Sequence, residues 1–381
     1  MNTIDRNITI HKTSAPPRLY VRKQQTDLLT PNGVCGNVSR VSGEPIRLSK
    51  TLRVLCALLC ALCVEMGCVH APPSPMRVAT YNIRQSGCDR DTPNAWDARK
   101  ADLVALVRKI APDVFGCQEV LPDQAEYLRE TLTEFAFAGE HRNKDRVSGE
   151  ASPVLYRKDR FEALDGGTFW LSETPDVPGS MSWDAAYLRI CTWVRLMDRR
   201  TGGVFCFANT HTDNKGELAR KEGLLLILRR MRELNPPGTP LVLVGDFNCR
   251  ENEEPVAAVA EKMGNALYAS ETPPTGPWRT TNGWHWEEDE LSAEEALSLD
   301  SETRNPKIKH TGRIDYIFVS KGAKVKSFET VGDPRPGMQT YPYRPFPRRL
   351  RAGVDTRGYG HKVTKPCSTN FPQNGSAPTG G

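Results

Sequence analysis

The 381-residue sequence contains no GxSxG motif, no catalytic Cys–His motif and no glycine-rich phosphate loop. These absences argue against a serine or cysteine nucleophile and against a nucleotide-binding loop. Histidine is scarce, with seven residues that are not clustered, and the cysteines after residue 70 are scattered singly, which makes a zinc site improbable. The net charge is only +5, so bulk charge gives no support to a nucleic-acid partner.

The sequence also lacks an apolar run long enough to span a bilayer. Residues 54–64 are uncharged and apolar, and basic residues precede them, which is typical of an export signal. We therefore assign residues 47–75 to an export signal and linker, with lipid attachment at Cys68 or cleavage after Ala71 as the two alternatives. Glu65 stands where lipoprotein signals usually carry an aliphatic residue, so the match is imperfect.

Residues 1–46 are polar and without periodicity, which predicts a disordered or mis-assigned N-terminus. If the signal is used, the protein is exported, either as a membrane-anchored lipoprotein or as a periplasmic or extracellular protein. If it is not used, the protein is cytoplasmic.

The folded region is expected over residues 76–342. Apolar patterning predicts strands at 77–83, 113–120, 153–156, 189–196, 204–212, 240–247 and 313–319, and helices at 94–110, 124–132 and 217–234. Strands outnumber helices, and several neighbouring strands are hairpin candidates, so a purely parallel sheet does not fit. The pattern favours an α/β (α+β) fold with two packed mixed sheets and helices outside.

Polar residues stand at the ends of these apolar strands. Asp246 and Asn248 follow a run typical of a buried strand, and residues two apart in an extended chain point to the same face. Together they are able to hold a water and a phosphoryl oxygen. The alternative is an ordinary turn, because Gly, Asp and Asn favour turns.

The same placement recurs elsewhere in the chain. His211 and Asp213 share a face after another strand, where a histidine is suited to stabilising charge on phosphate, or is an ordinary hydrogen-bonded side chain. Glu119, Asn82 and Asp315 also lie at strand ends. These oxygen and amide groups favour Mg²⁺ or Mn²⁺ over zinc. Without a side-chain nucleophile, the pattern favours direct attack by water on phosphorus.

The ordered motifs resemble the endonuclease/exonuclease/phosphatase superfamily of metal-dependent phosphoesterases, and within it the bacterial secreted branch. The motifs are TYNI at 80–83, QE at 118–119, SPVLYRKDRF at 152–161, GTFWLSETPDVPGS at 167–180, NTHTD at 209–213, GDFN at 245–248 and RIDYIFVS at 313–320. The resemblance covers about residues 77–339. It implies a deoxyribonuclease-like four-layer sandwich, in agreement with the two packed sheets.

The resemblance also implies roles for individual residues. Glu119 would bind the metal, and Asn82 beside it would contact metal-bound water or the substrate phosphate. His211 would stabilise the transition state, and Asp246 with Asn248 would orient and activate the water. Asp315 would orient a partner histidine. Arg189 is assigned to substrate phosphate, with a structural salt bridge as the alternative, and Tyr156 and Arg157 are open in the same way.

The sequence departs from the family at its end. Members carry a Ser-Asp-His motif that opens a final strand, expected here just after residues 340–342, but the chain continues with a Pro-, Arg- and Gly-rich segment. The change suggests a reading-frame shift, so residues 343–381 are expected to be an aberrant, disordered tail without a strand. His361 follows Gly360 instead of an aspartate and is a poor substitute for the missing base.

Three functions remain open. The first is an exported, monomeric Mg²⁺-dependent hydrolase of phosphate esters, whose substrate is a nucleic acid, nucleotide, phospholipid or sugar phosphate. The second is an inactive frameshifted product that retains phosphate or nucleotide binding. The third is an intracellular RNA 3′ exonuclease of deadenylase type. Trp170, Trp183, Trp278, Trp284 and Trp286 lie in predicted loops, where they serve either base or sugar stacking or ordinary packing.

Overall fold

The computed structural model describes residues 75–281, 292–299 and 313–331, together with the backbone of residues 349–355. The predictions for residues 1–46 and for the export signal, including Cys68, lie outside the described residues. The described residues all belong to one unit, residues 70–381. Within the described ranges, no helix combines the length and apolar character needed to cross a membrane.

The first sheet has the strand order β11-β12-β1-β2-β4-β3. Its strands are β1 (Met76–Asn82), β2 (Val114–Gln118), β3 (Phe135–Ala138), β4 (Val154–Arg157), β11 (Lys324–Val331) and β12 (Arg349–Asp355). β1 and β2 are parallel, with Asn82 opposite Gln118, and the other pairs are antiparallel. The sheet is therefore mixed, as the sequence predicts.

The second sheet has the order β5-β6-β7-β8-β10-β9. Its strands are β5 (Phe161–Trp170), β6 (Ile190–Asp198), β7 (Val204–His211), β8 (Leu241–Asp246), β9 (Met263–Asn265) and β10 (Asp315–Ser320). β7 and β8 are parallel, and the other neighbours pair antiparallel. This sheet is mixed in the same way.

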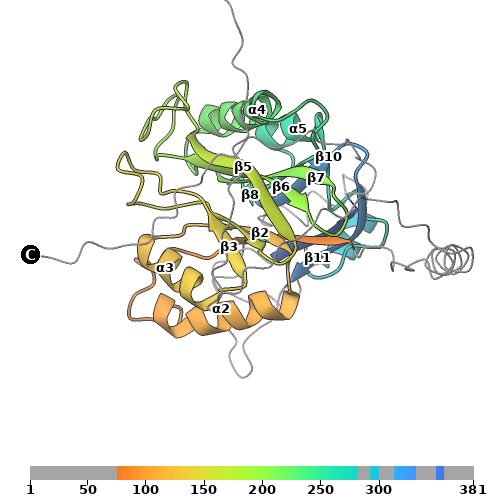
Figure 1. The fold of residues 1–381 in the computed structure, drawn as a ribbon, viewed down its shortest axis with the longest axis horizontal. Helices are drawn as coiled ribbons and strands as arrows, with labels where there is room; N and C mark the ends of the chain where they lie inside the picture. The colour runs from red at the N-terminus through yellow and green to blue at the C-terminus, as the bar shows by residue number, and fades with distance from the viewer. Residues whose placement is uncertain (1–74, 282–291, 300–312, 332–348, 356–381) are drawn as a thin grey trace, which may run out of the picture. The chain divides into compact units, whose positions relative to one another are not determined.

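Helices cover the outer faces of both sheets (Figure 1). α2 (Trp96–Ile110) and α3 (Pro122–Thr131) lie against the first sheet, and α4 (Glu217–Leu234) and α5 (Glu254–Ala260) lie against the second. A short helix, α6 (Ala293–Ser298), contributes Ala293 and Ala296 to the apolar core between the sheets. The layers are thus helix, sheet, sheet, helix, which confirms the predicted four-layer sandwich.

Local sequence explains where the main helices begin and end. α2 buries Leu103, Val107 and Ile110 on one face and ends where Ala111 adopts a left-handed conformation. α3 begins with Pro122, which suits a first turn because proline has no backbone N–H to leave unpaired.

β12 corrects one sequence prediction. The segment 343–381 is expected to lack strands, but residues 349–355 form β12 between β1 and β11, antiparallel to both. The prediction of a strandless tail is wrong at these seven residues, while the domain boundary at 342 stays a prediction. The physical reason is that β2 pairs with only one edge of β1. A strand at the other edge satisfies its backbone N–H and C=O groups by pairing with β1 and β11, and this gain is not visible in a segment of weak strand propensity.

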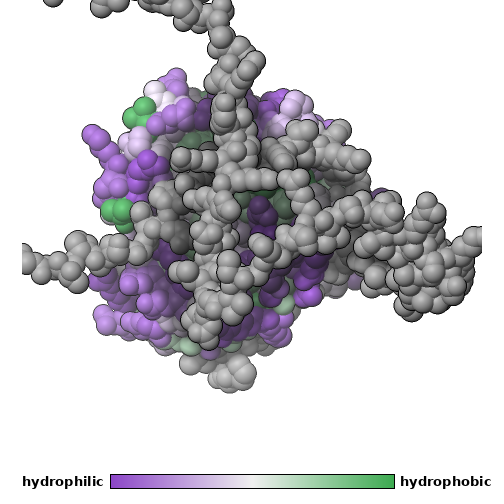
Figure 2. Space-filling view, in the orientation of Figure 1, coloured by the Kyte–Doolittle hydropathy of each residue, from purple (hydrophilic) through white to green (hydrophobic). Residues whose placement is uncertain are grey.

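On the face shown in Figure 2, the visible described surface is mainly hydrophilic. In Figure 2 the apolar colour forms isolated spots on the visible face. The large apolar side chains that are exposed are Val147, Val177, Met181, Tyr187, Leu218 and Tyr268. Scattered single residues of this kind are normal on a folded domain and identify no partner by themselves.

Candidate functional site

Strand alternation brings the polar residues to the gap between the two sheets. The inward faces carry the apolar core, which includes Val78 on β1, Val244 on β8 and Ile317 on β10. The same face carries Asn82 four residues after Val78, Asp246 two residues after Val244 and, on antiparallel β10, Asp315 two residues before Ile317. The candidate site is therefore the polar end of the inter-sheet layer.

Three predicted residues of the second sheet form one row. His211 on β7 is paired with Asp246 on β8, and Asp246 is paired with Asp315 on β10. The His211 Nε2 atom lies 3.8 Å from the Asp246 Oδ2 atom. All three side chains are buried. The register of the sheet thus gathers groups that are up to about a hundred residues apart in the sequence.

Asn82 connects this row to the first sheet. Its Nδ2 atom donates hydrogen bonds to Glu119 Oε1 and to Asp246 Oδ2, both at 2.9 Å. Glu119 also accepts a hydrogen bond from the backbone N–H of Gln85 at 3.1 Å. One buried amide therefore holds together two carboxylates that come from opposite sheets.

Asn248 is tied to His211. Its Nδ2 atom lies 2.9 Å from His211 Nε2 and donates to the carbonyl oxygen of Thr212 at 3.0 Å. Both amide hydrogens are thus directed to protein acceptors, and the Nε2 atom of a neutral His211 ring acts as the acceptor. The amide oxygen of Asn248 is then the atom suited to accept a hydrogen bond from a water.

Two of these residues adopt unusual backbone conformations. Glu119 has φ 60° and Asn248 has φ 47°. Asparagine visits this left-handed region readily, but glutamate does so rarely and at a cost of about 1–3 kcal/mol. Such strain is concentrated at functional positions, because the surrounding structure must hold it.

A glutamate outside the predicted set, Glu150, lies beside His211 and is paired with Arg142. Glu150 Oε2 lies 3.9 Å from His211 Nδ1 and accepts a 2.7 Å hydrogen bond from Arg142. Burial raises the pKa of Glu150 above its usual value, Arg142 opposes the rise, and Glu119 adds to it. Both residues lie in the loop between β3 and β4, so no strand-end pattern marks them in the sequence.

Arg189 belongs to the same cluster. Its guanidinium lies 3.8 Å from Glu150 and 3.8 Å from Asp213, and it stacks near the ring of Tyr187. Burial lowers the pKa of Arg189 from its usual value, although Glu150 acts against this. The salt-bridge alternative therefore has support, and substrate contact by Arg189 stays a prediction.

Asp213 accepts hydrogen bonds from backbone N–H groups of two loop segments. Its two oxygens accept hydrogen bonds from the backbone N–H groups of Ala186 and Tyr187 and of Lys215 and Gly216, at 2.8 to 3.1 Å. Burial opposes ionisation of Asp213, but these four donors lower its pKa overall. Asp213 anchors the loop that carries Tyr187 and Arg189.

Several other predicted residues lie away from the site. Tyr156 packs against the inter-sheet core, and Arg157 pairs with Asp159 near the surface. Trp170 and Trp278 are buried, which supports packing over base stacking. Trp284 and Trp286 lie outside the described residues. The partner histidine expected after residue 342 falls in a segment of which only residues 349–355, without a histidine, are described.

The donor set suits one hard divalent cation. Among the described residues, no group of three or more His, Cys, Asp or Glu side chains is arranged to hold a metal ion. Glu119 and Asp246 nevertheless face one gap, and Mg²⁺ is typically held by one or two carboxylates, with water and substrate phosphate completing its shell. Asn82 presents its nitrogen to these carboxylates, so its role as a direct ligand stays a prediction.

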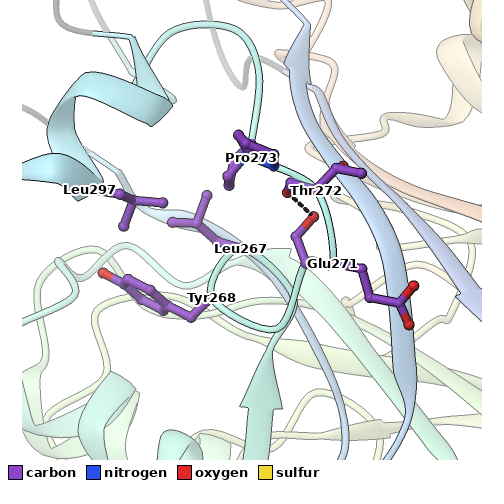
Figure 3. A pocket seen from close by; sticks show the side chains of 8 residues that line it. Leu267, Tyr268, Glu271, Thr272, Pro273 and Leu297 are labelled. Atoms are coloured by element: carbon purple, nitrogen blue, oxygen red, sulfur yellow. Dashed lines mark hydrogen bonds between the residues drawn. The ribbon is translucent and has the colours of Figure 1, made fainter.

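A surface pocket of about 510 Å³ lies elsewhere (Figure 3). Leu267, Pro273 and Leu297 point toward one another at its centre, with the Tyr268 ring below them, while the Glu271 carboxylate points away. None of the predicted site residues lines it. Its lining does not contain a group of carboxylate, amide and imidazole side chains like the one at the polar strand ends.

Comparison with known proteins agrees with this geometry. The Endonuclease/Exonuclease/phosphatase family matches residues 79–342. An endonuclease/exonuclease/phosphatase structure from Bacteroides vulgatus is 31% identical, with a TM-score of 0.63, covering 74% of this chain and 99% of that one. A mannosyl-6-phosphatase from Bacteroides thetaiotaomicron is 29% identical, with a TM-score of 0.62 and coverage of 74% and 99%.

Matches to curated sequences are shorter. The DNA-(apurinic or apyrimidinic site) endonuclease 2 of Saccharomyces cerevisiae is 31% identical over 106 residues, which are 27% of this chain and 20% of that protein. Another curated relative is matched over 35% of its length. The chain thus spans between a fifth and about a third of these relatives. Members of the matched family are generally phosphoester hydrolases that use divalent metal ions. The family match covers well over half of the sequence, and the chain belongs to the endonuclease/exonuclease/phosphatase family.

Proposed function

We propose that this protein hydrolyses phosphate esters with Mg²⁺, or Mn²⁺, by in-line attack of water on phosphorus. The observation that carries the proposal is the Asn82 amide, which lies 2.9 Å from carboxylates of both sheets. Buried carboxylates are costly unless they are hydrogen-bonded or bind a cation, so this arrangement supports a cation site. When bound there, the cation would polarise the phosphate and neutralise the leaving oxygen.

Asp246 is the group best placed to activate water. Its Oδ1 atom accepts a hydrogen bond from the backbone N–H of Asn248 at 2.9 Å, which fixes the carboxylate, and its Oδ2 atom faces Asn82. In the proposed reaction, Asp246 accepts the proton of the attacking water while the amide oxygen of Asn248 orients that water. Glu119 is the proposed metal ligand.

His211 is proposed to stabilise charge on the phosphoryl group. Because Asn248 donates to Nε2, the ring proton of neutral His211 lies on Nδ1, which faces Glu150. Protonation of Nε2 would require the Asn248 amide to turn, and it would then give a donor for a phosphate oxygen. Arg189 supplies a second positive group within the same cluster.

The substrate class is a phosphate ester, and both diesters and monoesters belong in the test. The relative named as a mannosyl-6-phosphatase supports including a sugar phosphate monoester. The relative named as an apurinic endonuclease supports including a DNA diester.

Export through residues 47–75 is proposed as well, and mass spectrometry of the mature N-terminus tests it, since an intracellular RNA 3′ exonuclease would show no processing at Cys68 or Ala71.

The C-terminal sequence is the reason to expect slow turnover. Residues 343–381 contain no Ser-Asp-His motif. Loss of a general base or acid typically costs about 10²–10⁴-fold in rate. An inactive chain that still binds phosphate is the alternative that this segment favours.

The test is Mg²⁺-dependent hydrolysis of bis-p-nitrophenyl phosphate, p-nitrophenyl phosphate and mannose 6-phosphate. The unchanged chain is compared with one that receives Ser-Asp-His after Pro342, and each is compared with its Asp246→Asn and Glu119→Gln variants. We expect Mg²⁺-dependent turnover that rises with the inserted motif and falls at least 10²-fold in both substitutions. Equal activity with and without the insertion would reject the frameshift interpretation. Absence of both hydrolysis and Mg²⁺ binding in all forms would reject the proposed enzyme.

A further inference from the structure

A layer of buried polar side chains lies between the apolar inter-sheet core and the candidate site. It consists of Thr80 on β1, Gln118 on β2 and Asn209 on β7, each with 0% exposure. Gln118 Nε2 donates to Thr80 Oγ1 at 2.9 Å and to Asn209 Oδ1 at 2.6 Å. These three residues are called the inter-sheet clamp below.

Asn209 links the two sheets directly. Its Nδ2 atom donates to the carbonyl oxygens of Cys117 at 2.7 Å and of Pro153 at 2.8 Å, on the opposite sheet side. Both amide hydrogens and the amide oxygen of Asn209 thus bond to groups of the first sheet. Its side chain lies directly over Gly116, where an added Cβ would collide with the Asn209 amide. The sheets can approach to this distance because residue 116 is glycine.

Each clamp residue is joined through the backbone to a residue of the candidate site. Thr80 precedes Asn82 by two positions, Gln118 immediately precedes Glu119, and Asn209 precedes His211 by two. In extended strands, residues two apart share a face, so Thr80 and Asn209 lie on the same inner face as Asn82 and His211. A shift at the clamp therefore moves groups from both sheets.

The clamp also carries a cost that stability alone does not explain. Within the described residues, the buried Oε1 atom of Gln118 has no hydrogen-bond donor. A purely apolar contact at this level would avoid that cost, as the layer below it does with Phe207 and Val242. Buried polar networks fix one geometry, whereas apolar faces tolerate small displacements.

We propose that Asn209 and its partners Gln118 and Thr80 are positioning residues, which set the distance between Glu119 on one sheet and Asp246 with His211 on the other. The predicted effect on catalysis rests on the proposed function, whereas the predicted effect on the distance between the sheets does not. The Asn82 amide reports the distance directly, because it holds both carboxylates at 2.9 Å only while the sheets keep their spacing.

The test compares Asn209→Leu with Phe207→Leu. Phe207 lies on the same strand and the same inner face, two residues further into the apolar core, so its truncation controls for lost stability. We expect both variants to melt at lower temperature. Asn209→Leu should lower kcat about 10²-fold with KM changed less than about threefold, as expected for misplacement of reacting groups, and Phe207→Leu should keep kcat within about threefold.

A double-mutant cycle separates positioning from general damage. If Asn209 acts through the placement of His211, then Asn209→Leu should cost less than about threefold in a His211→Ala background. Equal rate losses for Asn209→Leu and Phe207→Leu, or additive losses in the cycle, would overturn the proposal.

Crystal structures of the variants give a readout that does not depend on turnover. In Asn209→Leu, we expect Asn82 to lose its hydrogen bond to Glu119 or to Asp246, and in Phe207→Leu both bonds should remain. Both bonds retained in Asn209→Leu would overturn the inference. If the unchanged protein neither binds Mg²⁺ nor hydrolyses a phosphate ester, the proposed function fails and this structural comparison alone decides the inference. Should Asn209→Leu not fold, Thr80→Val replaces it, and Thr80→Ser, which keeps the hydroxyl, should restore the unchanged behaviour.

Discussion

Replacing Asn82 by aspartate tests whether one buried amide holds the carboxylates of Glu119 and Asp246 around one gap. In the native chain, one amide nitrogen donates to both carboxylates, and the side chain is 1% exposed. Asn82→Asp keeps the shape but replaces two donors by a third carboxylate. A hydrogen bond to a charged group contributes about 1.5–3 kcal/mol, so loss of both should lower the free energy of unfolding by about 3–6 kcal/mol.

The assay is urea unfolding in the presence of EDTA, followed by the same measurement with Mg²⁺. An ion that binds only the native state stabilises it, and a third carboxylate strengthens its binding. Mg²⁺ should therefore recover more stability in Asn82→Asp than in the unchanged protein. Asn265→Asp is the matched control: the Asn265 oxygen accepts from the backbone N–H of Leu267, and aspartate keeps this acceptor, so the expected change is within about 0.5 kcal/mol.

The reasoning would be refuted by an Asn82→Asp variant that unfolds within about 1 kcal/mol of the unchanged protein in EDTA. That result would mean that the Asn82 amide does not bridge the two carboxylates in the metal-free protein. The same refutation follows if Mg²⁺ stabilises Asn82→Asp no more than it stabilises Asn265→Asp.

Two further predictions concern the scaffold of the site. The pKa of Asp213 is lowered in the folded state, so its contribution to stability is fully present above the unfolded pKa and is lost as the pH falls through the folded pKa. In a pH series of thermal scans, Asp213→Asn should therefore lower the melting temperature at pH 7 and lower it much less at the acid end. An equal loss at both ends would contradict this. Gly245 has φ 150°, and a Cβ there would collide with the carbonyl oxygen of Thr210. Gly245→Ala should lower the free energy of unfolding by about 3 kcal/mol or more in urea titration, whereas Gly202→Ala, with open space around residue 202, should cost clearly less.

The sequence predicted the architecture and the gathering of the site residues because both follow from strand periodicity. Apolar runs located β1, β2, β7, β8 and β10, and the polar residue that ends each run had to lie at the edge of the inter-sheet core. Asn82 and Asp246 are 164 residues apart, but the same alternation places both on inner faces. Their proposed roles come from the family resemblance and stay predictions.

Other features left no periodic signal. β5 and β11 each contain an irregularity in their pairing register, which breaks the alternation that marks a strand. Glu150 reaches His211, and Arg142 reaches Glu150, from a loop whose path depends on tertiary contacts rather than on local pattern. In the sequence, Thr80 and Asn209 stand out only as parts of the TYNI and NTHTD motifs, because a polar residue inside a strand looks the same whether it bonds across sheets or faces solvent.

The position of β12 has a consequence for biosynthesis. β1 is the first described strand to leave the ribosome, yet one of its two neighbours, β12, is the last. At about 5–20 residues per second, the edge of β1 waits on the order of tens of seconds for its partner. During that interval the nascent sheet presents an open edge, which is prone to pairing with other chains. The yield of folded protein should therefore depend more on the time for which this edge is open, and on chaperone binding to it during translation, than on the stability of the finished fold.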